Sequence, residues 1–335
     1  MLLLGRIGLL AAAASAPQWS VILPGTTVME ADPPPGEAVS GAAASLSAGI
    51  AAMKGETEHR VVVGRLPAGA AAIPNISVSF SSWQRAGTAS PGGDGVPMEV
   101  GAGGGAEVAA LSWREQGYVD CQPYGYHMPR GHGWYPDPLL EPLPGGATLR
   151  PAVTTSLWLT VAVSPTAPAG NYTARAVLST PSGVLLTLTL ELEVWPITLP
   201  SIDQSRFSNI ISYSDLPLVT NQTAVYSFMC DHHTPPTAIY GTSPRPHSDY
   251  EFMGGAECGG GSHWLNLGDL PFVAGGGRKA SYSAADIAKK IAALEPTVEW
   301  LRSQGKLDRA FVYGFDEQPA SMETAIRQLF GGIKA

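Results

Sequence analysis

The chain of 335 residues is long enough for two domains, and its 44% apolar residues can fill sizeable cores. A formal net charge of −8, with no run of basic residues, excludes nucleic-acid binding, because that affinity depends on clustered lysine and arginine. The 39 glycines and 29 prolines are concentrated at 32–56, 86–106 and 241–277, which predicts loops or inserts there.

The first sixteen residues have the order of a secretory signal peptide. Arg6 supplies a positive charge, residues 7–16 form an apolar run, and Ala14-Ser15-Ala16 matches a small-residue cleavage pattern. The alternative is an apolar N-terminus of a cytosolic protein. No later segment reaches the roughly 18 apolar residues that a membrane span requires. We therefore expect a secreted protein without a membrane span.

Three N-x-Ser/Thr sequons agree with secretion and predict a glycoprotein; they begin at Asn75, Asn171 and Asn221. The cysteines are too few and too scattered for a disulfide framework. One bridge and one free thiol can form, and the sequence does not choose the pair among Cys121, Cys230 and Cys258.

The pattern of residues 57–199 predicts an antiparallel β-sandwich, preceded by a low-complexity segment at 17–56. Strands are expected at 59–63, 76–80, 157–163, 172–178 and 184–194. The last is the clearest, because apolar residues alternate with threonine and glutamate over eleven positions, which is the period of a half-buried strand. Its apolar members are Leu186, Leu188, Leu190, Leu192 and Val194.

Beyond Leu199-Pro200, strands alternate with helices, which predicts βα units and a parallel sheet. Short strands are expected at 209–213, 237–240 and 263–267, with a helix at 224–232. The best helix begins after Ser283, and Pro296 is expected to kink or split it. A strand at 310–315 and a helix from Ser321 follow. The count of about four units predicts roughly half of a TIM-type barrel at 200–335.

Two carboxylates, Asp316 and Glu317, directly follow the apolar strand at 310–315. In parallel α/β sheets, catalytic groups gather at the carboxyl ends of the strands. Side chains of neighbouring strand residues point to opposite faces of the sheet. Both acids can therefore face one pocket only if the strand's hydrogen-bond ladder ends there, and the Gln318-Pro319 step would end it. The alternative is an exposed acidic turn at the start of the next helix.

Two other groups of side chains have competing interpretations. Metal-ligating residue types fill positions 230–233, but consecutive helical residues fan out around the axis. Ordinary polar residues at a helix end account for them better, so neither a metal nor a cofactor is expected. Four aromatic residues can stack on a sugar ring or simply pack in a core: Trp134, Tyr135, Trp264 and Tyr313.

Several separated motifs together resemble glycoside hydrolase family 123. The segment VYGFDE at 312–317 is similar to the family's strand and acid pair, and WYPDPLL at 134–140 to a segment before its barrel. The run from LWL at 157–159 to PAGNY at 168–172 resembles its sandwich strands. DHHTPP at 231–236 resembles a segment after its first barrel helix. The motifs occur in the same order over about residues 130–320.

The resemblance implies a β-N-acetylgalactosaminidase-like enzyme that acts on N-acetylhexosamine glycans with retention and substrate assistance. Asp316 would orient the 2-acetamido group, and Glu317 would act as general acid and then as general base. Tyr313, Trp264 and His233 would contact the substrate. His233 stands where the family usually has arginine.

A full barrel would need roughly another half after Ala335, so we expect a truncated chain that is not active as it stands. The alternative function is a non-catalytic secreted carbohydrate-binding sandwich with a degenerate barrel.

Overall fold

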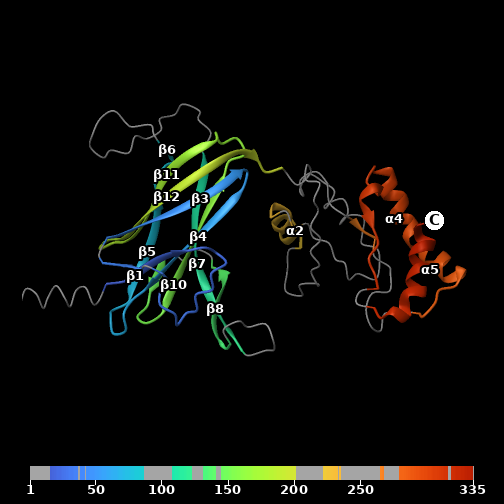
Figure 1. Ribbon diagram of the computed structural model, residues 1–335, viewed down its shortest axis with the longest axis horizontal. Helices are drawn as coiled ribbons and strands as arrows, with labels where there is room; N and C mark the ends of the chain where they lie inside the picture. Colours follow the sequence, from blue (N-terminus) through green and yellow to red (C-terminus); the bar gives the residue numbers. More distant parts are fainter. Residues whose placement is uncertain are drawn as a thin grey trace, which may run out of the picture. The chain divides into compact units, whose positions relative to one another are not determined.

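The computed structural model describes residues 16–36, 38–41, 43–86, 108–122, 131–140, 145–200, 222–232, 234, 265–267, 279–315 and 318–334. The chain divides into two compact units, Met1–Leu199 and Pro200–Ala335. The division falls at the Leu199-Pro200 step, where the sequence pattern changes. The first unit is built from strands, and the second contains helices and short strands (Figure 1).

The first sheet of unit one is antiparallel throughout. Its strand order is β2-β1-β4-β10-β7-β8. The strands are β1 (Gln18–Ile22), β2 (Val39–Ser40), β4 (Thr57–Arg65), β7 (Ala109–Cys121), β8 (Gly133–Leu139) and β10 (Thr154–Val163). Strand β8 lies at one edge, which suits its two prolines because an edge strand can lack ladder donors.

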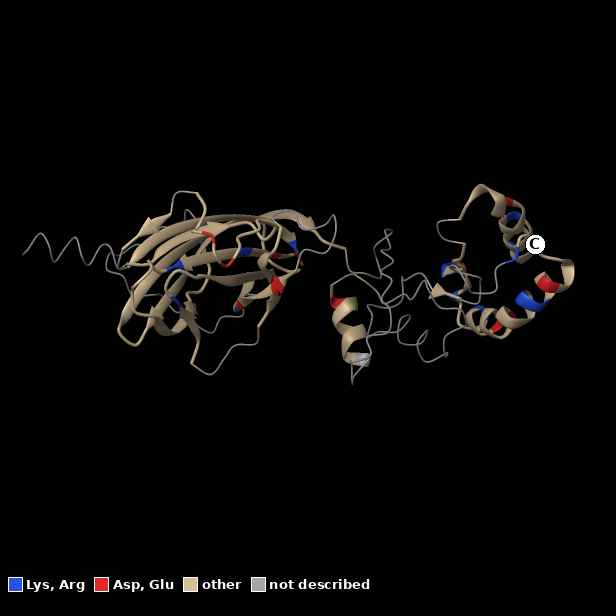
Figure 2. Ribbon diagram, turned by 90° about the horizontal axis from the view of Figure 1, so that it is seen from below, with Lys and Arg blue, Asp and Glu red and all other residues tan. Residues whose placement is uncertain are grey.

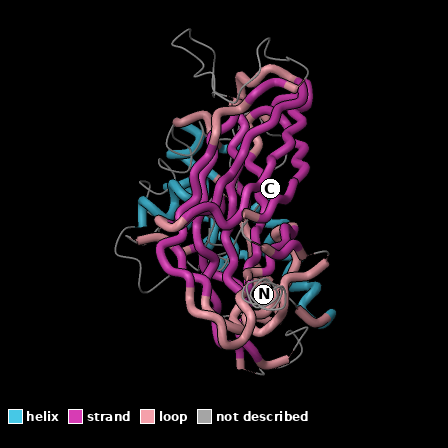
Figure 3. The backbone as a smooth tube through the Cα atoms, turned by 90° about the vertical axis from the view of Figure 1, so that its left-hand side faces the viewer, coloured by secondary structure: helices cyan, strands magenta, loops and turns pink. Residues whose placement is uncertain are grey.

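The second sheet is mixed, which corrects the expectation of a purely antiparallel sandwich. Its order is β3-β12-β11-β5-β9, and β6 (Gln84–Arg85) also pairs with β11. Strands β3 and β12 run parallel, whereas the other pairs are antiparallel. The strands are β3 (Ala44–Lys54), β5 (Ile73–Phe80), β9 (Ala147–Leu149), β11 (Gly170–Thr180) and β12 (Gly183–Thr198). Figure 3 shows the strands of this unit side by side.

The core of this unit lies between the two sheets and follows the alternation in the sequence. The five apolar residues predicted to share one face of β12 are all buried, as are alternate residues of β10 and the ring of Trp19 on β1. This arrangement confirms the β-rich unit. It arises because a strand with period-two apolar residues can bury one face only against a second apolar surface.

The segment at 17–56, expected to be of low complexity, instead supplies three strands. Strand β3 pairs with β12 from Ala44 opposite Leu186 to Ala52 opposite Val194. Its alanines, serines and glycine resemble a linker by composition. Every second residue from Ala48 to Ala52 is nevertheless buried, as a half-buried strand requires. The sandwich therefore begins well before residue 57.

The described part of unit two includes one strand–helix–strand unit. Strands β13 (Leu265–Asn266) and β14 (Ala310–Phe311) pair in parallel, and helix α4 (Ala284–Ser303) lies between them in sequence. Helices α2 (Gln222–Asp231) and α5 (Glu323–Lys334) and the 3₁₀ turns η3 (Leu307–Arg309) and η4 (Ala320–Met322) complete it. The strands expected at 209–213 and 237–240 lie outside the described residues, so the half-barrel stays a prediction.

Helix α4 begins as the sequence predicts but is not split. The Ser283 hydroxyl accepts from the Asp286 N–H, and the Asp286 carboxylate accepts from the Ser283 N–H, which completes a capping box. Pro296 lies within one continuous helix. Proline leaves the carbonyl four residues earlier without its donor, and that residue, Ala292, is exposed, so water can replace the lost bond.

Candidate functional site

The predicted catalytic pair follows strand β14. The Leu267 N–H donates to the Phe311 carbonyl at 2.9 Å, and Val312 to Phe315 continue without strand pairing. The ladder is therefore shorter than the strand expected at 310–315, and it ends before Gln318-Pro319. Asp316 and Glu317 themselves lie outside the described residues. Alternation between two sheet faces does not constrain a chain that has already left its ladder.

Phe315 has an unusual backbone conformation directly before Asp316. Its φ is +56°, in the left-handed region that bulky residues rarely occupy. The ring is buried, with its centroid 6.1 Å from that of Tyr282 and 6.2 Å from that of Phe330. Packing of the ring offsets the backbone strain, and strained residues of this kind cluster at functional sites. No signal in the sequence predicts this turn.

The structure separates the aromatic candidates. Tyr313 is half-buried on the irregular segment before Phe315. Tyr135 is buried, and its hydroxyl donates to the Gly131 carbonyl at 2.9 Å, so it packs in the sandwich. The neighbouring Trp134 is 49% exposed. Two other predicted substrate contacts, Trp264 and His233, lie outside the described residues.

Two of the residues at 230–232 make contacts that can be described. Cys230 is disulfide-bonded, whereas Cys121 is a free thiol. The His232 ring packs edge-on against Phe228, with centroids 4.3 Å apart. Within the described ranges, no three His, Cys, Asp or Glu side chains are grouped to hold a metal ion. In that same part of the chain, no helix is long and apolar enough to cross a membrane.

A hollow of about 640 Å³ lies on the second sheet of the sandwich, where β3, β12 and β11 meet. Its charged lining residues are Arg60, Glu191 and Glu193, and Asn171 and Thr173 of one sequon also border it. The positions of acidic and basic residues are distributed over several of the described strands and helices (Figure 2).

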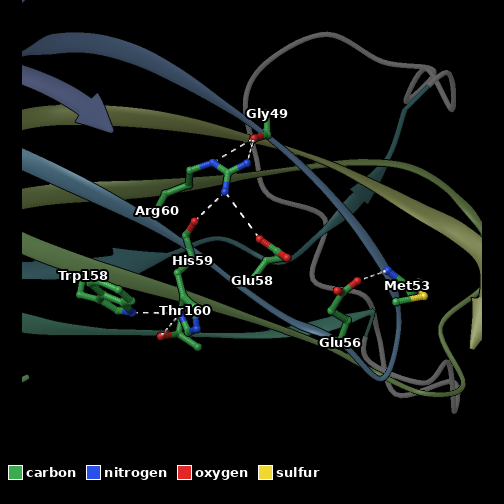
Figure 4. Close-up of polar contacts among 8 residues, drawn as sticks. All are labelled: Gly49, Met53, Glu56, Glu58, His59, Arg60, Trp158 and Thr160. Atoms are coloured by element: carbon green, nitrogen blue, oxygen red, sulfur yellow. Dashed lines mark hydrogen bonds and ion pairs between the residues drawn. The ribbon is translucent and has the colours of Figure 1, made fainter. Parts of the chain in front are cut away.

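Arg60 is occupied by the protein itself (Figure 4). Its Nε donates to the Gly49 carbonyl at 3.0 Å, its Nη1 donates to the His59 carbonyl at 2.6 Å, and Nη1 lies 3.8 Å from the Glu58 carboxylate. Gly49 belongs to β3, which is the edge strand of its sheet. The guanidinium thus covers the Gly49 carbonyl at a sheet edge, and these contacts account for the charge within the protein.

His59 is likewise part of the sheet structure. The Trp158 indole Nε1, which can only donate, gives a hydrogen bond to His59 Nδ1 at 2.9 Å. The Thr160 hydroxyl lies 3.2 Å from the same nitrogen. Nδ1 is therefore an acceptor without a proton, and the three side chains lock β4 against β10 (Figure 4).

Two residues of strand β7 have shifted pKa values. Burial raises the pKa of the Glu115 carboxyl, while the nearby Arg150 charge opposes the rise. Burial also raises the pKa of Tyr118, against the effect of its 2.7 Å hydrogen bond with Ser156. Both shifts follow from packing of the sheet.

No model of a known protein family matches the chain, and no curated protein matches it. Among solved structures, it is similar to a family 123 glycoside hydrolase from Clostridium perfringens, studied for glycolipid glycan hydrolysis, with 13% identity and a TM-score of 0.43. That match covers 64% of this chain and 32% of the hydrolase. The chain thus spans about a third of that protein's length.

Two other similar structures are those of AvmM, which catalyses macrocyclization in alchivemycin A biosynthesis, and the N-terminal domain of PorA. The first has 13% identity and a TM-score of 0.23, over 48% of this chain and 89% of AvmM. The second has 10% identity and a TM-score of 0.21, over 54% of this chain and 99% of that domain. TM-scores below 0.5 do not establish a shared fold. No family assignment rests on them.

Proposed function

We propose that the chain is part of a glycoside hydrolase of the family 123 type. Asp316 and Glu317 would be the catalytic residues with which it cleaves the glycosidic bonds of N-acetylhexosaminides. The proposal rests on where the segment VYGFDE lies. It follows β14, which pairs in parallel with β13 across helix α4, and the left-handed Phe315 comes directly before the first acid. Active sites of βα folds are built at such strand ends.

The two adjacent acids would act in sequence on one sugar. The 2-acetamido oxygen attacks the anomeric carbon while Asp316 accepts a hydrogen bond from the acetamido N–H. The glycosidic C–O bond breaks as Glu317 gives its proton to the leaving oxygen. Water then attacks the same carbon, Glu317 takes the water's proton, and the oxazolinium ring opens to restore the acetamido group. No nucleophilic carboxylate is required, so two neighbouring acids suffice.

The test is hydrolysis of an aryl N-acetyl-β-galactosaminide by the chain, with any coding sequence that continues beyond Ala335 included. Glu317→Gln should lower kcat by about 100-fold or more, which is the usual contribution of general acid–base catalysis. Asp316→Asn should slow N-acetylated substrates more than substrates without the acetamido group. Asp308→Asn, an exposed acid on η3, is the matched control and should retain the full rate. Unchanged rates in both active-site variants would rule out the assignment.

We also propose that the protein is secreted. The disulfide at Cys230 supports this, because disulfides persist in oxidising compartments. Mass spectrometry of protein recovered from culture medium, with the N-terminus and glycan masses measured, tests the signal peptide and the sequons together. A chain found only inside the cell, starting at Met1 and without glycans, would contradict it.

A further inference from the structure

Strands β7 and β8 form a ribbon at one edge of the first sheet, and one face of it combines an aromatic ring with polar groups. Asp120 and Trp134 are directly opposite each other in the antiparallel register, so their side chains point to the same face. The indole of Trp134 is 49% exposed. The ribbon therefore presents a flat apolar ring and a charged hydrogen-bond acceptor on one face.

The Asp120 carboxylate is held in place by two neighbours. His132 Nε2 lies 2.9 Å from Oδ1, and Gln122 Nε2 donates to Oδ2 at 3.1 Å. Each oxygen therefore receives one hydrogen bond and keeps acceptor capacity for another. The side chains of Asp120 and His132 are 38% and 53% exposed, so a ligand in solvent can reach the carboxylate oxygens.

The backbone beneath these side chains is fixed on both sides. The Glu30 N–H donates to the Trp134 carbonyl at 3.2 Å, and β7 pairs with β8 from Cys121 opposite Gly133 onward. The Tyr135 hydroxyl donates to the Gly131 carbonyl, which holds the backbone directly before His132. A ligand would meet a preformed surface, so little ordering entropy is lost on binding.

We propose that this face, formed by Asp120, Gln122, His132 and Trp134, binds a neutral hexopyranoside ring. The C–H groups on one side of such a ring can cover the indole, and adjacent ring hydroxyls can donate to the two oxygens of Asp120. The four residues belong to unit one, whereas Asp316 and Glu317 belong to unit two. The face would serve a hydrolase and a non-catalytic carbohydrate-binding protein equally, so it does not depend on the proposed reaction.

The experiment titrates the full chain, labelled with ¹⁵N, with methyl β-galactopyranoside and methyl β-N-acetylgalactosaminide, and follows the Trp134 indole N–H signal. The backbone N–H signals of Asp120 and His132 are followed as well, because they also report binding by the Trp134 variants. Saturable shifts are expected with one or both sugars. Sorbitol, which has the hydroxyls but no ring face, should cause none. Trp134→Ala and Asp120→Ala should each weaken binding at least tenfold, and Trp134→Tyr should restore most of it. No saturable shift with either sugar, or equal shifts with sorbitol, would overturn the proposal.

Two control variants show whether the sugar binds at this face or elsewhere on the protein. Trp195→Ala removes a tryptophan of similar exposure, 41%, from strand β12 of the other sheet, and should leave binding unchanged. The Asp316→Asn/Glu317→Gln double variant should also bind normally. If binding instead survives in Trp134→Ala and disappears in the double variant, the sugar binds at the acid pair and the proposed surface is wrong. Unchanged thermal unfolding of Trp134→Ala shows that a loss of binding is not a loss of fold.

Discussion

At the scale of single residues, the contact between Trp19 and Gly64 gives a sharp stability prediction. The Trp19 ring is buried over Gly64, its register partner, and a Cβ at residue 64 would lie 2.6 Å from the ring atom Cε3. Gly64→Ala must therefore displace the ring or the strand, and we expect a loss of about 1–3 kcal/mol in unfolding free energy. Urea unfolding followed by the Trp19 indole signal measures it.

Gly49→Ala is the matched control for that change. Gly49 also lies within a strand, but a Cβ there would meet no atom within 4 Å. The stability of this variant should stay the same or rise slightly, since alanine loses less backbone entropy than glycine. If both substitutions destabilised the protein equally, the loss of unfolding free energy would come from replacing any glycine within a strand and not from the contact with Trp19.

At this scale the sequence shows residue types but not the conformations and contacts that give them a role. Asp316 and Glu317 can be read from the sequence as an acid pair after an apolar strand, and their role stays a prediction because both lie outside the described residues. The left-handed Phe315 is not visible, because its conformation depends on the packing of its ring against Tyr282 and Phe330. The contact between Asp120 and His132 is not visible either. The two residues are twelve positions apart, and only the β7–β8 register brings them together.

At the scale of elements, the start of helix α4 should be sensitive to acid. Hydrogen bonds from Lys279 and from Ser283 lower the pKa of Asp286 to about 2. Because the folded-state pKa is depressed, this stabilisation is present above the ordinary value of 3.8 and is lost as pH falls toward 2. Asp286→Asn should therefore destabilise α4 at pH 7, and the difference from wild type should shrink between pH 4 and about 2.

The capping box can be tested at neutral pH through Ser283. Ser283→Ala removes the acceptor for the Asp286 N–H and should cost about 1 kcal/mol of stability. Urea unfolding followed by the indole signal of Trp300, which lies on α4, reports both changes. Glu299→Gln breaks an exposed pair with Arg302 near the other end of the helix and should have little effect. A larger effect from Glu299→Gln than from Ser283→Ala would contradict the capping argument.

Elements are predictable where one pattern is strong and self-contained. Strand β12 alternates from Leu186 to Val194, and α4 has both a cap and an apolar stripe, so both are found near their expected positions. Strands β3 and β8 are not predicted, because alanine-rich and proline-containing segments have low strand propensity. Their pairing comes from partners distant in sequence, which a local pattern does not contain.

At the scale of the whole molecule, the two compact units are visible as a change of pattern at Leu199-Pro200. The barrel is inferred by counting units, and only one strand–helix–strand unit falls within the described residues. The N-terminal boundary predicted for the sandwich, at residue 57, is too late. By composition alone 17–56 resembles a linker, although β1 pairs with β4 and β3 with β12.

That boundary leads to a test of what the sandwich needs in order to fold. Removing residues 17–56 takes away β1 and β3. The Trp19 ring that covers Gly64 is then lost, and the edge of β12 that pairs with β3 becomes unpaired. An unpaired strand edge beside a row of buried leucines favours aggregation. The fragment 17–199 should therefore give dispersed amide NMR signals and a cooperative thermal transition, whereas 57–199 should not. If 57–199 folded as stably as 17–199, the first three strands would be additions to the sandwich and not parts of its core.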